Sequence, residues 1–434
     1  MIENLKLPDD WEINLFEKVI LKFFDYRGKT PLKLGMDWGN GNILALSANN
    51  VEMGRINKEK EAYYASEELY NIWMNKGDLK KEDILMTMEA PLGNITQVPD
   101  NKKYILSQRV VAIRTKNQLV EKFYTYFLKS EYFQAELRKK STGTTALGIS
   151  QKNLFPLKVF YPKSTNEQKK IAYILQSIEK NIESTEKIIE KYKKIKLGLM
   201  SDLLTGRIRI KDGKKYVETE FDIVDGIRKP IDWEVKSLGD VGDFKNGLNK
   251  GKDDFGFGIK FVNISDAYET DCVKIDNLGL INASKNEIKT YKLKDGDIVL
   301  VRSSVKLEGV GYPVLFEELT KEDIVYCGFM IRYRLFNKKL ILPNYLLFLL
   351  KHHSTRRKVL NYATKSANVN INQESYKNIK IMFPKKEAEQ QAILELVLKQ
   401  NRLIEKEELY LEKLKKLKAG LMEDLLTGKV RVKY

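Results

Sequence analysis

The chain has 434 residues, of which 43% are hydrophobic and 31% are charged, with 26 glycines and 10 prolines. This composition is typical of a globular protein with two or three domains, and it excludes a disordered or collagen-like chain. Lys and Arg number 76 against 59 for Asp and Glu, which gives a net charge of +17. A charge of this sign predicts a polyanionic partner, with nucleic acid favoured over an anionic membrane surface.

Cysteine use and the N-terminal segment indicate the compartment. Cys272 and Cys327 are too few for a disulfide framework and show no spacing typical of metal ligands. The N-terminal residues lack the apolar stretch of a signal peptide, and the chain has no run of about 18 apolar residues. We therefore expect a cytoplasmic protein without a metal site.

A repeat with a spacing of 222 residues sets the expected architecture. Of the sixteen residues in Ile195–Ile210, ten are identical in Leu417–Val432. The same spacing relates the Asp-Trp-Glu triplets that begin at Asp10 and Asp232. The chain therefore consists of two copies of one unit of about 222 residues.

Each copy begins with a predicted α+β domain, over residues 1–161 and 230–383. Short β-like runs such as DILMTM, RVVAIR, DIVLVRSS and FMIRYRLF are separated by turn residues and followed by a helical segment. A polar loop follows at 141–150 and at 364–372, and its side chains differ between the copies. Two domains that read different sequences would differ in this way, and so would tandem copies that drifted without functional meaning.

A long helix follows each domain, at 162–210 and 384–434, and residues 211–229 are expected to link the copies. In the first helix a heptad pattern includes Ile171, Leu175 and Ile178, and Thr185 fills a gap. In the second helix, Gln400 and Glu407 interrupt the same register. The apolar positions assigned to the second helix are Ile393, Val397, Ile404, Leu411, Leu414, Leu417 and Leu421.

The helices have two interpretations. A Thr-Gly pair ends each one, at Gly206 and Gly428, where glycine can adopt the left-handed cap. At ~1.5 Å per residue, each helix spans on the order of 55 Å. Such helices are typical of a plain dimerisation coiled coil. Two of them in one chain can instead pair antiparallel and separate two domains by a fixed distance.

Catalytic motifs are weak or missing in this sequence. The adjacent His352 and His353 point about 100° apart on a basic helix, which does not suit a catalytic pair, so a solvated or phosphate-facing role is predicted. The segment DWGNGN at 37–42 has one Gly-x-Gly, and the chain has no Pro-Pro dipeptide for an amino-methyltransferase motif. Arg27-Gly28-Lys29-Thr30 lacks the first glycine of a Walker A loop.

Polar and basic residues gather in loops at matching places in the two copies. Phosphate contacts position a protein on DNA, while Arg, Lys, Asn, Gln, Ser and Thr side chains at base edges select the sequence. Each loop taken alone is also explained as a solvated turn. The predicted DNA contacts are Arg27, Lys29, Thr30, Ser141, Thr142, Gly143, Thr144 and Thr145 in the first copy, and Asn249, Lys250, Lys252, Arg302, Ser303, Ser304, Lys365, Ser366, Asn368 and Asn370 in the second.

The whole chain resembles the specificity subunit of type I restriction-modification systems. The resemblance rests on the repeated GLMSDLLTGRIRI and GLMEDLLTGKVRV, the NEQKKIA and AEQQAIL helix starts, and the Pro-x-Asp-Trp-Glu entry to each domain. It implies a non-catalytic protein with two target recognition domains, each reading half of a bipartite site in double-stranded DNA. It also implies that the helices form an antiparallel spacer that docks two methyltransferase subunits.

The resemblance further implies which subunits supply the chemistry. Partner subunits would bind S-adenosylmethionine for adenine-N6 methylation, and restriction (translocase-nuclease) subunits would use ATP, so no cofactor is expected on this chain. The apolar helix ends are predicted to dock the methyltransferase, although packing between the two helices would also explain them. These residues are Leu199, Met200, Leu203, Leu421, Met422 and Leu425. A coiled-coil adaptor that binds nucleic acid non-specifically and a stand-alone DNA methyltransferase are the alternatives.

Overall fold

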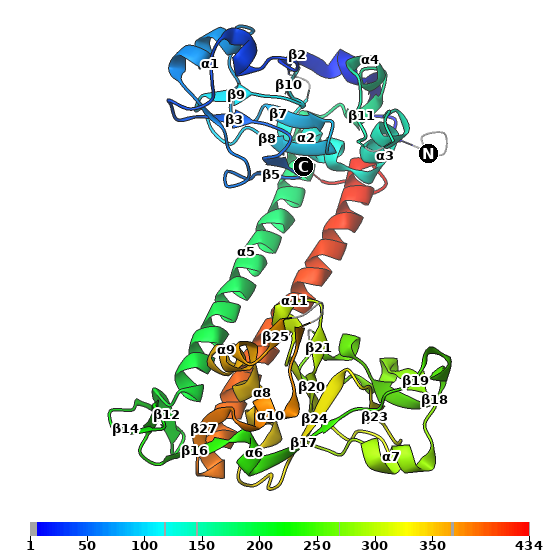
Figure 1. Ribbon diagram of the computed structural model, residues 1–434. Coiled ribbons are helices and arrows are strands. Elements are labelled where there is room, and N and C mark those ends of the chain that lie inside the picture. Colours follow the sequence, from blue (N-terminus) through cyan, green and yellow to red (C-terminus); the bar gives the residue numbers. More distant parts are fainter. Residues whose placement is uncertain (1–6, 117–118, 145, 269, 366–368, 434) are drawn as a thin grey trace. The chain divides into compact units, whose positions relative to one another are not determined.

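The computed structural model describes residues 7–116, 119–144, 146–268, 270–365 and 369–433 (Figure 1). The chain divides into two compact units. The first unit comprises Met1–Lys187 and Glu408–Tyr434, and the second comprises Ile188–Glu407. Each unit therefore contains one α+β domain and a part of each long helix.

The first domain is built on a four-stranded antiparallel sheet, in the order β2-β10-β7-β8, and a three-stranded sheet, in the order β6-β3-β9. The pair β1-β11 brings the start of the domain beside its end. The helices and strands are β1 (Trp11–Leu15), β2 (Ile20–Asp25), β3 (Ile43–Leu46), β4 (Val51–Glu52), β5 (Arg55–Ile56), β6 (Tyr64–Ala65), α1 (Glu67–Trp73), β7 (Ile84–Met88), β8 (Leu92–Gln97), β9 (Tyr104–Leu106), β10 (Val110–Thr115), α2 (Glu121–Lys129), α3 (Glu131–Lys139), α4 (Gln151–Leu154) and β11 (Lys158–Pro162).

The second domain repeats this topology, with sheets in the orders β17-β24-β20-β22 and β19-β18-β23 and the pair β16-β27. A further small sheet has the order β21-β26-β25. The elements are β16 (Trp233–Ser237), α6 (Leu238–Val241), β17 (Gly242–Asn246), β18 (Phe255–Val262), β19 (Gly279–Ile281), α7 (Lys285–Tyr291), β20 (Asp297–Val301), β21 (Ser303–Ser304), β22 (Pro313–Phe316), β23 (Val325–Tyr326), β24 (Met330–Leu335), α8 (Pro343–Lys351), α9 (His353–Asn361), β25 (Thr364–Lys365), β26 (Val369–Asn370), α10 (Gln373–Lys377) and β27 (Lys380–Pro384).

In each domain, successive residues of the central strands face opposite sides of the four-stranded sheet, so that the domain has three layers. On β10, Val111 and Ile113 pack with the helices α2 and α3, whereas Val110 and Ala112 pack with the sheet that contains β3. This is the two-residue period of a strand buried on both faces. The parallel pairs β3-β9 and β18-β23 make the strand content of each domain mixed. The α+β prediction is therefore confirmed.

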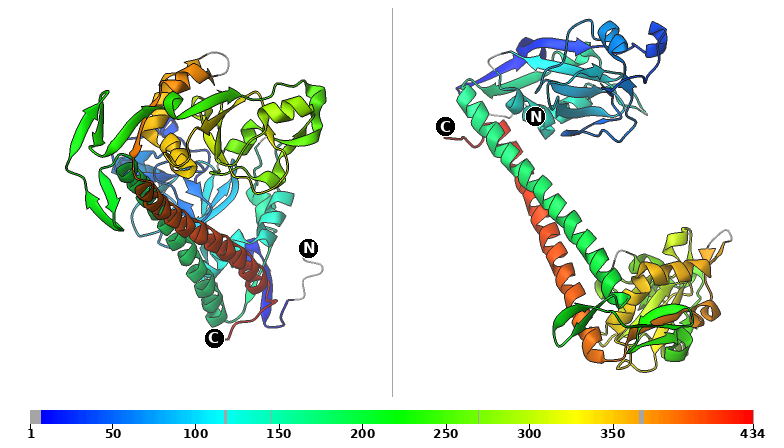
Figure 2. Two further views of the ribbon diagram at one scale, coloured as in Figure 1. Left: turned by 90° about the horizontal axis from the view of Figure 1, so that it is seen from below. Right: turned by 90° about the vertical axis from the view of Figure 1, so that its left-hand side faces the viewer.

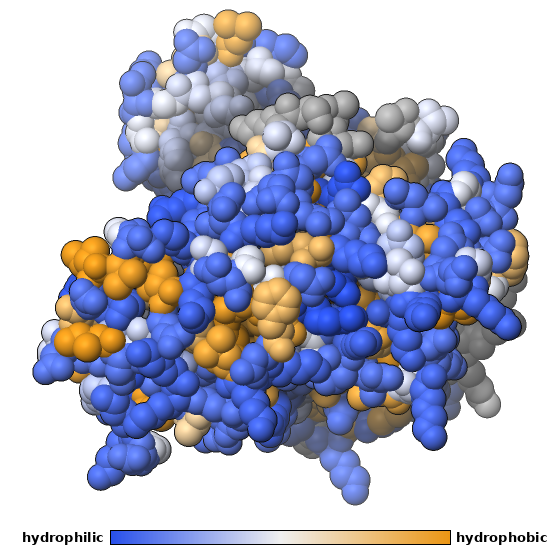
Figure 3. Space-filling view, turned by 60° about the horizontal axis from the view of Figure 1, so that its bottom comes forward, coloured by the Kyte–Doolittle hydropathy of each residue, from blue (hydrophilic) through white to orange (hydrophobic). Residues whose placement is uncertain are grey.

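The segment expected as a linker folds into two hairpins. They comprise β12 (Ile208–Lys211) with β13 (Lys214–Val217), and β14 (Phe221–Val224) with β15 (Ile227–Pro230). Val217 and Ile223 are exposed on them. The face drawn in Figure 3 is mostly hydrophilic, and apolar atoms form separate groups, one of them at the left edge, on the side where Figure 1 places these hairpins.

The two long helices are α5, from Thr165 to Leu204, and α11, from Glu387 to Leu426. Both are shorter than the segments 162–210 and 384–434, because each ends before its Thr-Gly pair and residues 208–210 belong to a strand. In the first unit, Glu179 pairs with Lys418 and Glu186 pairs with Lys415, so the helices run antiparallel there. They also lie antiparallel in the second unit, where the Gln400 amide donates to the backbone carbonyl of Tyr192 (Figures 1 and 2).

Burial along the helices follows the predicted heptads, with one exception. Ile171, Leu175 and Thr185 are buried on α5. On α11 the side chain of Leu417 is exposed, so its assignment to the apolar seam was wrong. The position is one of three closely spaced leucines, and its neighbour Leu414 occupies the buried side.

Equivalent caps and ion pairs end the two helices. Gly206 and Gly428 have φ angles of 69° and 72°, which confirms the predicted left-handed cap. A Cβ at Gly206 would lie 2.4 Å from a Pro230 side-chain atom, so only glycine fits. Three residues after each cap an arginine makes ion pairs. Arg209 pairs with Asp232, Glu389 and Glu218, and Arg431 pairs with Asp10 and Glu167.

Each predicted helical segment near the end of a domain is broken into two helices. The break falls at Ser130, between α2 and α3, and at His352, between α8 and α9. Both residues have ψ near 140–150°, outside the helical range. The Ser130 hydroxyl accepts a hydrogen bond from the Phe133 amide and so caps α3.

Candidate nucleic-acid interface

Three neighbouring strands of each four-stranded sheet place their connecting loops at one end of the sheet. In the first domain Asp25 at the end of β2 pairs with Val111, and Thr87 at the end of β7 pairs with Val110. The loops after β2 and β7 and the loop before β10 therefore meet. In the second domain the pairs Asn246–Ile331 and Val301–Met330 likewise bring together the loops after β17 and β20 and the loop before β24.

The polar loop predicted in each copy joins this end of the sheet in the same way. In the first domain the amide of Ile149 donates to the carbonyl of Met88, and Gly148 bridges to Glu89 and Thr142. In the second domain the amide of Ile371 donates to the carbonyl of Arg302, and Asn370 pairs with Ser303 and Thr364. We name these regions loop edge 1 (residues 26–30, 89, 107–109, 141–144 and 146–149) and loop edge 2 (residues 247–252, 302–304, 327–329, 364–365 and 369–371).

The structure thus brings together loops that the sequence suggested separately. Ser303 and Ser304 form β21, which pairs with β26. Loop edge 2 therefore unites residues 302–304 with residues 364–365 and 369–370, although some 60 residues separate them in the sequence. Thr145, Ser366, Asn368 and the side chain of Lys365 lie outside the described residues.

Several of the predicted cations have partners inside the protein. Arg27 forms a 2.6 Å ion pair with Asp25, which helps to hold the pKa of that half-buried carboxyl below its usual value. The Lys29 ammonium donates to the carbonyl of Trp73, and burial together with the charge of Lys76 lowers its pKa. These two side chains therefore fix the loop that carries Thr30, whose hydroxyl accepts from Lys33.

In the second copy, Lys250 is likewise paired, at 3.0 Å from Glu287, while Lys252 and Asn249 are exposed. A Cβ at Gly328 would lie 1.6 Å from Oδ1 of Asn249, so the Asn249 amide lies directly on the glycine backbone. The Arg302 guanidinium donates to the carbonyl of the same glycine. Asn249 and Arg302 therefore approach each other across Gly328.

The remaining predicted residues of the first copy lie on the polar loop itself. Thr142, Gly143 and Thr144 are exposed. The Ser141 hydroxyl is half-buried and donates to the carbonyl of Arg138 at the end of α3. The exposed part of this loop thus carries the hydroxyl groups of Thr142 and Thr144 and the apolar side chains of Ala146 and Leu147.

Sequence reasoning missed Arg109 and Phe329, which occupy equivalent positions. The carbonyl of Arg109 accepts from the amide of Met88, and that of Phe329 accepts from the amide of Arg302. Both residues are exposed and directly precede the central strands β10 and β24. Alignment of the two copies at a spacing of 222 residues does not pair Arg109 with Phe329, because these two residues are 220 positions apart. Between the equivalent strands β7 and β20 the spacing is shorter still.

The helix-end residues predicted to dock a methyltransferase pack into the domain cores. Leu203 and Leu425 are fully buried, in the second and the first unit respectively. Met200 is buried with Leu203, and Leu199, Leu421 and Met422 are partly buried against the same cores. This packing accounts for their apolar character, and their role in docking stays a prediction.

The histidines do not have the environment that the sequence suggested. His352 is buried, because it lies at the break between α8 and α9, and its Nδ1 is 2.8 Å from the Ser354 hydroxyl. Only its neighbour His353 is exposed, so the solvated or phosphate-facing interpretation was wrong for His352. Within the described residues, no three His, Cys, Asp or Glu side chains come together as a metal site. Nor does any helix described here have the length and apolar character to span a membrane.

Comparisons with known proteins agree on one family. The model of the type I restriction modification DNA specificity domain matches residues 8–194 and 230–416. The chain is 26% identical over 449 residues to the type I restriction enzyme MjaVIII specificity subunit of Methanocaldococcus jannaschii, covering 100% of this chain and 96% of that protein. It is 22% identical over 386 residues to the EcoKI specificity subunit of Escherichia coli, covering 87% and 80%.

Solved structures show the same fold. A chain in a solved structure of the type I R-M system, which describes complex assembly and conformational transition, has a TM-score of 0.62 at 16% identity. The match covers 98% of this chain and 100% of that one. The S subunit from M. genitalium has a TM-score of 0.53 at 15% identity, covering 97% and 98%. With one matched domain in each half, the chain belongs to the family of type I restriction-modification specificity subunits, the non-catalytic components that give these systems their DNA sequence specificity.

Proposed function

We propose that each domain reads one half of a bipartite DNA site through its loop edge. The observation that carries this proposal is the equivalence of the two loop edges: the same backbone hydrogen bonds hold them, while the side chains differ. Two domains with a common scaffold would dock on DNA alike and select different bases, because base edges are read by side chains.

Within each loop edge, side chains that solvent reaches are the proposed base contacts. In loop edge 1 these are the exposed Thr142, Thr144 and Arg109, and in loop edge 2 they are the exposed Asn249 and the partly buried Asn370, Ser303 and Ser304. Arg27, Lys29 and Lys250 support the loops through their internal partners instead. The net charge of +17 favours phosphate contacts around these edges.

The helices α5 and α11 are proposed to set the distance between the half-sites and to dock two methyltransferase subunits. Each helix has 40 residues, or ~60 Å. Ile195 and Leu417 are equivalent in the repeat and exposed on α5 and α11, so they replace the buried helix-end leucines as the best candidates for docking. Restriction subunits, S-adenosylmethionine and ATP would enter with the partners, and the chain itself would direct adenine-N6 methylation.

The test is methylation of a random-sequence DNA pool by the purified partner methyltransferase with and without this chain. We expect methylated adenines to concentrate at one bipartite motif only when the chain is present. A chain that carries both Arg109→Gly and Asn249→Ala is the matched control, because it should still bind the methyltransferase and yet lose the motif. Methylation without any motif in the presence of the wild-type chain would support a non-specific adaptor instead.

A further inference from the structure

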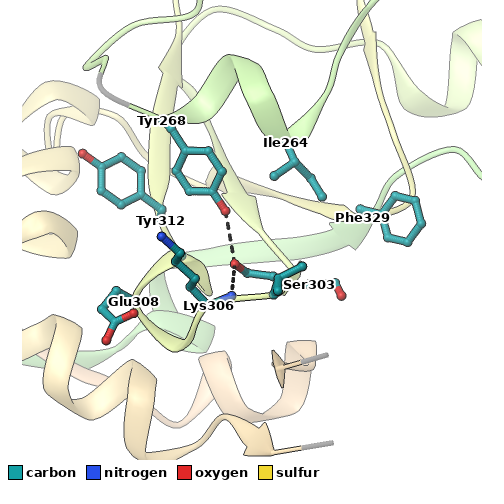
Figure 4. A pocket seen from close by; sticks show the side chains of 10 residues that line it. Ile264, Tyr268, Ser303, Lys306, Glu308, Tyr312 and Phe329 are labelled. Carbon is teal, nitrogen blue, oxygen red and sulfur yellow. Dashed lines mark hydrogen bonds between the residues drawn. The ribbon is translucent and has the colours of Figure 1, made fainter. Parts of the chain in front are cut away.

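The second domain has an apolar cavity of about 690 Å³ beside loop edge 2 (Figure 4). Ile264, Tyr268, Tyr312 and Phe329 supply its apolar and aromatic lining. The rings of Tyr268 and Tyr312 lie 5.8 Å apart on one side, and Figure 4 shows Phe329 across from them. The hydroxyl of Tyr268 donates to that of Ser304, at 3.4 Å, which fixes the aromatic side of the cavity against β21.

A cavity of about 340 Å³ lies at the equivalent place in the first domain. Arg109, equivalent to Phe329, lines it, and so does Ala48, two residues after β3. Its counterpart Ile264 lies two residues after β18. The equivalence follows from the strand ends, because the amide of Ser107 donates to Leu46 and the amide of Cys327 donates to Val262.

The two cavities differ in chemistry. The first cavity also has aromatic lining, from Trp38 and Tyr63, but at its corner Arg109 supplies a guanidinium group beside the amide of Gln108. In the second domain the same corner presents Phe329, which is 60% exposed, and Val305, which is 85% exposed. Exposed apolar side chains that flank a cavity mark a binding site.

The surroundings of the second cavity indicate its occupant. Gly328, which precedes Phe329, lies under the Asn249 amide and accepts from Arg302. Lys306 and Glu308 both line the cavity and are exposed, so the cavity carries one cation and one carboxylate. The apolar corner is therefore bordered by groups suited to base edges and phosphates, which favours DNA over an apolar protein segment.

We propose that this corner receives the major-groove edge of a thymine in the half-site that the second domain reads, and that Phe329 determines this specificity. Thymine presents a C5-methyl group and the O4 acceptor in the major groove, and among the four unmodified bases it is the one with a methyl group there. Phe329 and Val305 would contact the methyl group, and the hydroxyl of Ser303 would donate to O4. The inference rests on the proposed function, in which loop edge 2 contacts DNA.

The experiment uses the complex of the chain with its methyltransferase. Exchange of residues 230–383 with the domain of a relative first identifies the half-site that the second domain reads. Each thymine of that half-site is then replaced singly by deoxyuridine, which lacks only the C5-methyl group, and binding of the duplexes is measured. We expect one position at which this replacement weakens binding by about fourfold, the effect of losing one buried methyl group.

Two variants test the role of Phe329. In Phe329→Ala, thymine and deoxyuridine should bind equally at that position, whereas Phe336→Ala should keep the wild-type difference. Phe336 is the matched control, because it is 67% exposed and directly follows the other end of β24. Unfolding temperature and assembly with the methyltransferase show that both variants fold.

Three results would overturn the inference: a half-site without thymine, equal binding of every deoxyuridine duplex to the wild type, or a thymine preference that survives in Phe329→Ala. In each of these cases the proposed function would still hold, provided that domain exchange changes one half of a bipartite motif. If no such motif exists, the proposed function itself fails, so the two failures are distinguishable.

Discussion

Arg109 shows how one residue can combine backbone strain with an exposed charge. Its φ of 64° lies in the left-handed region, which residues other than glycine rarely adopt. The amide of Met88, which bonds to its carbonyl, holds this conformation in place. Strained residues of this kind are concentrated at binding sites, and this one lines the cavity beside Thr30.

We predict that Arg109→Gly weakens recognition of the first half-site and spares the fold. Glycine adopts the same backbone without strain, so the free energy of unfolding should change by less than about 1 kcal/mol. Loss of the guanidinium should cost about 1–3 kcal/mol in discrimination at one base pair. Binding to duplexes with single substitutions in each half-site measures this, and unaltered preference in the first half-site would refute it.

His352 makes the stability of the second unit depend on pH. Burial, aided by the charge of His353, lowers its pKa from 6.5 to about 4. The unfolded chain therefore binds more protons than the folded chain between these values, and the free energy of unfolding should rise with pH from about 4 to 6.5, by up to about 3 kcal/mol. Urea unfolding at several pH values should show this slope in the wild type and in His353→Asn. A slope that persists in His352→Asn would contradict the assignment.

At the scale of elements, the equivalent arginines at the two helix ends differ in burial. The Arg209 side chain is 1% exposed and its hydrogen bonds lower the pKa of Asp232, whereas the Arg431 side chain is 39% exposed. Removing either arginine leaves buried carboxylates without a counter-charge. At Arg209 these are Glu389 and Glu218, 6% and 10% exposed, whereas at Arg431 it is Glu167 alone, 0% exposed.

We therefore expect Arg209→Ala to lower the free energy of unfolding by about 3–5 kcal/mol and Arg431→Ala by clearly less. Denaturant titration, followed by a probe in each unit, measures both. Equal losses in the two variants would show that the number of carboxylates left buried does not decide the energetics of these networks.

The spacer helices give a second prediction at this scale. Four residues inserted both after Lys187 in α5 and after Glu407 in α11 add one turn, or ~6 Å, to each helix at matching levels. Since a base pair rises ~3.4 Å, the preferred gap between half-sites should lengthen by about one or two base pairs. An insertion in α5 alone is the control and should impair helix pairing. A folded double-insertion complex that keeps the original gap would show that the helices do not set it.

Much of the element structure follows from the sequence. The heptads predicted α5, and the apolar runs around Ile84, Val110 and Ile298 predicted central strands, because burial on both faces leaves a clear pattern. The break at His352 was missed, since helix-compatible residues lie on both sides of it and no Pro or Gly marks the position. The hairpins at 208–230 were missed as well, because Val217 and Ile223 are exposed and bury little surface that a pattern could reveal.

At the scale of the whole molecule, the repeat explains why the candidate site was only partly predictable. The spacing of 222 residues holds at the domain edges and along the helices, where ion pairs such as Arg209–Glu389 and Arg431–Glu167 repeat. Within the domains, insertions shift the spacing to 220 at Arg109 and Phe329. The hydrogen bonds between strands show that Arg109 and Phe329 are equivalent, whereas an alignment of the two copies without gaps does not.

The central claim is that two independent DNA-reading domains share one chain, and exchange of one domain tests it most directly. Residues 230–383 are replaced by the equivalent domain of a relative, and the methylome of a host carrying the methyltransferase is sequenced. We predict that one half of the methylated motif changes to that of the relative, while the other half and the gap stay the same. A change in both halves together, or in neither, would contradict the account.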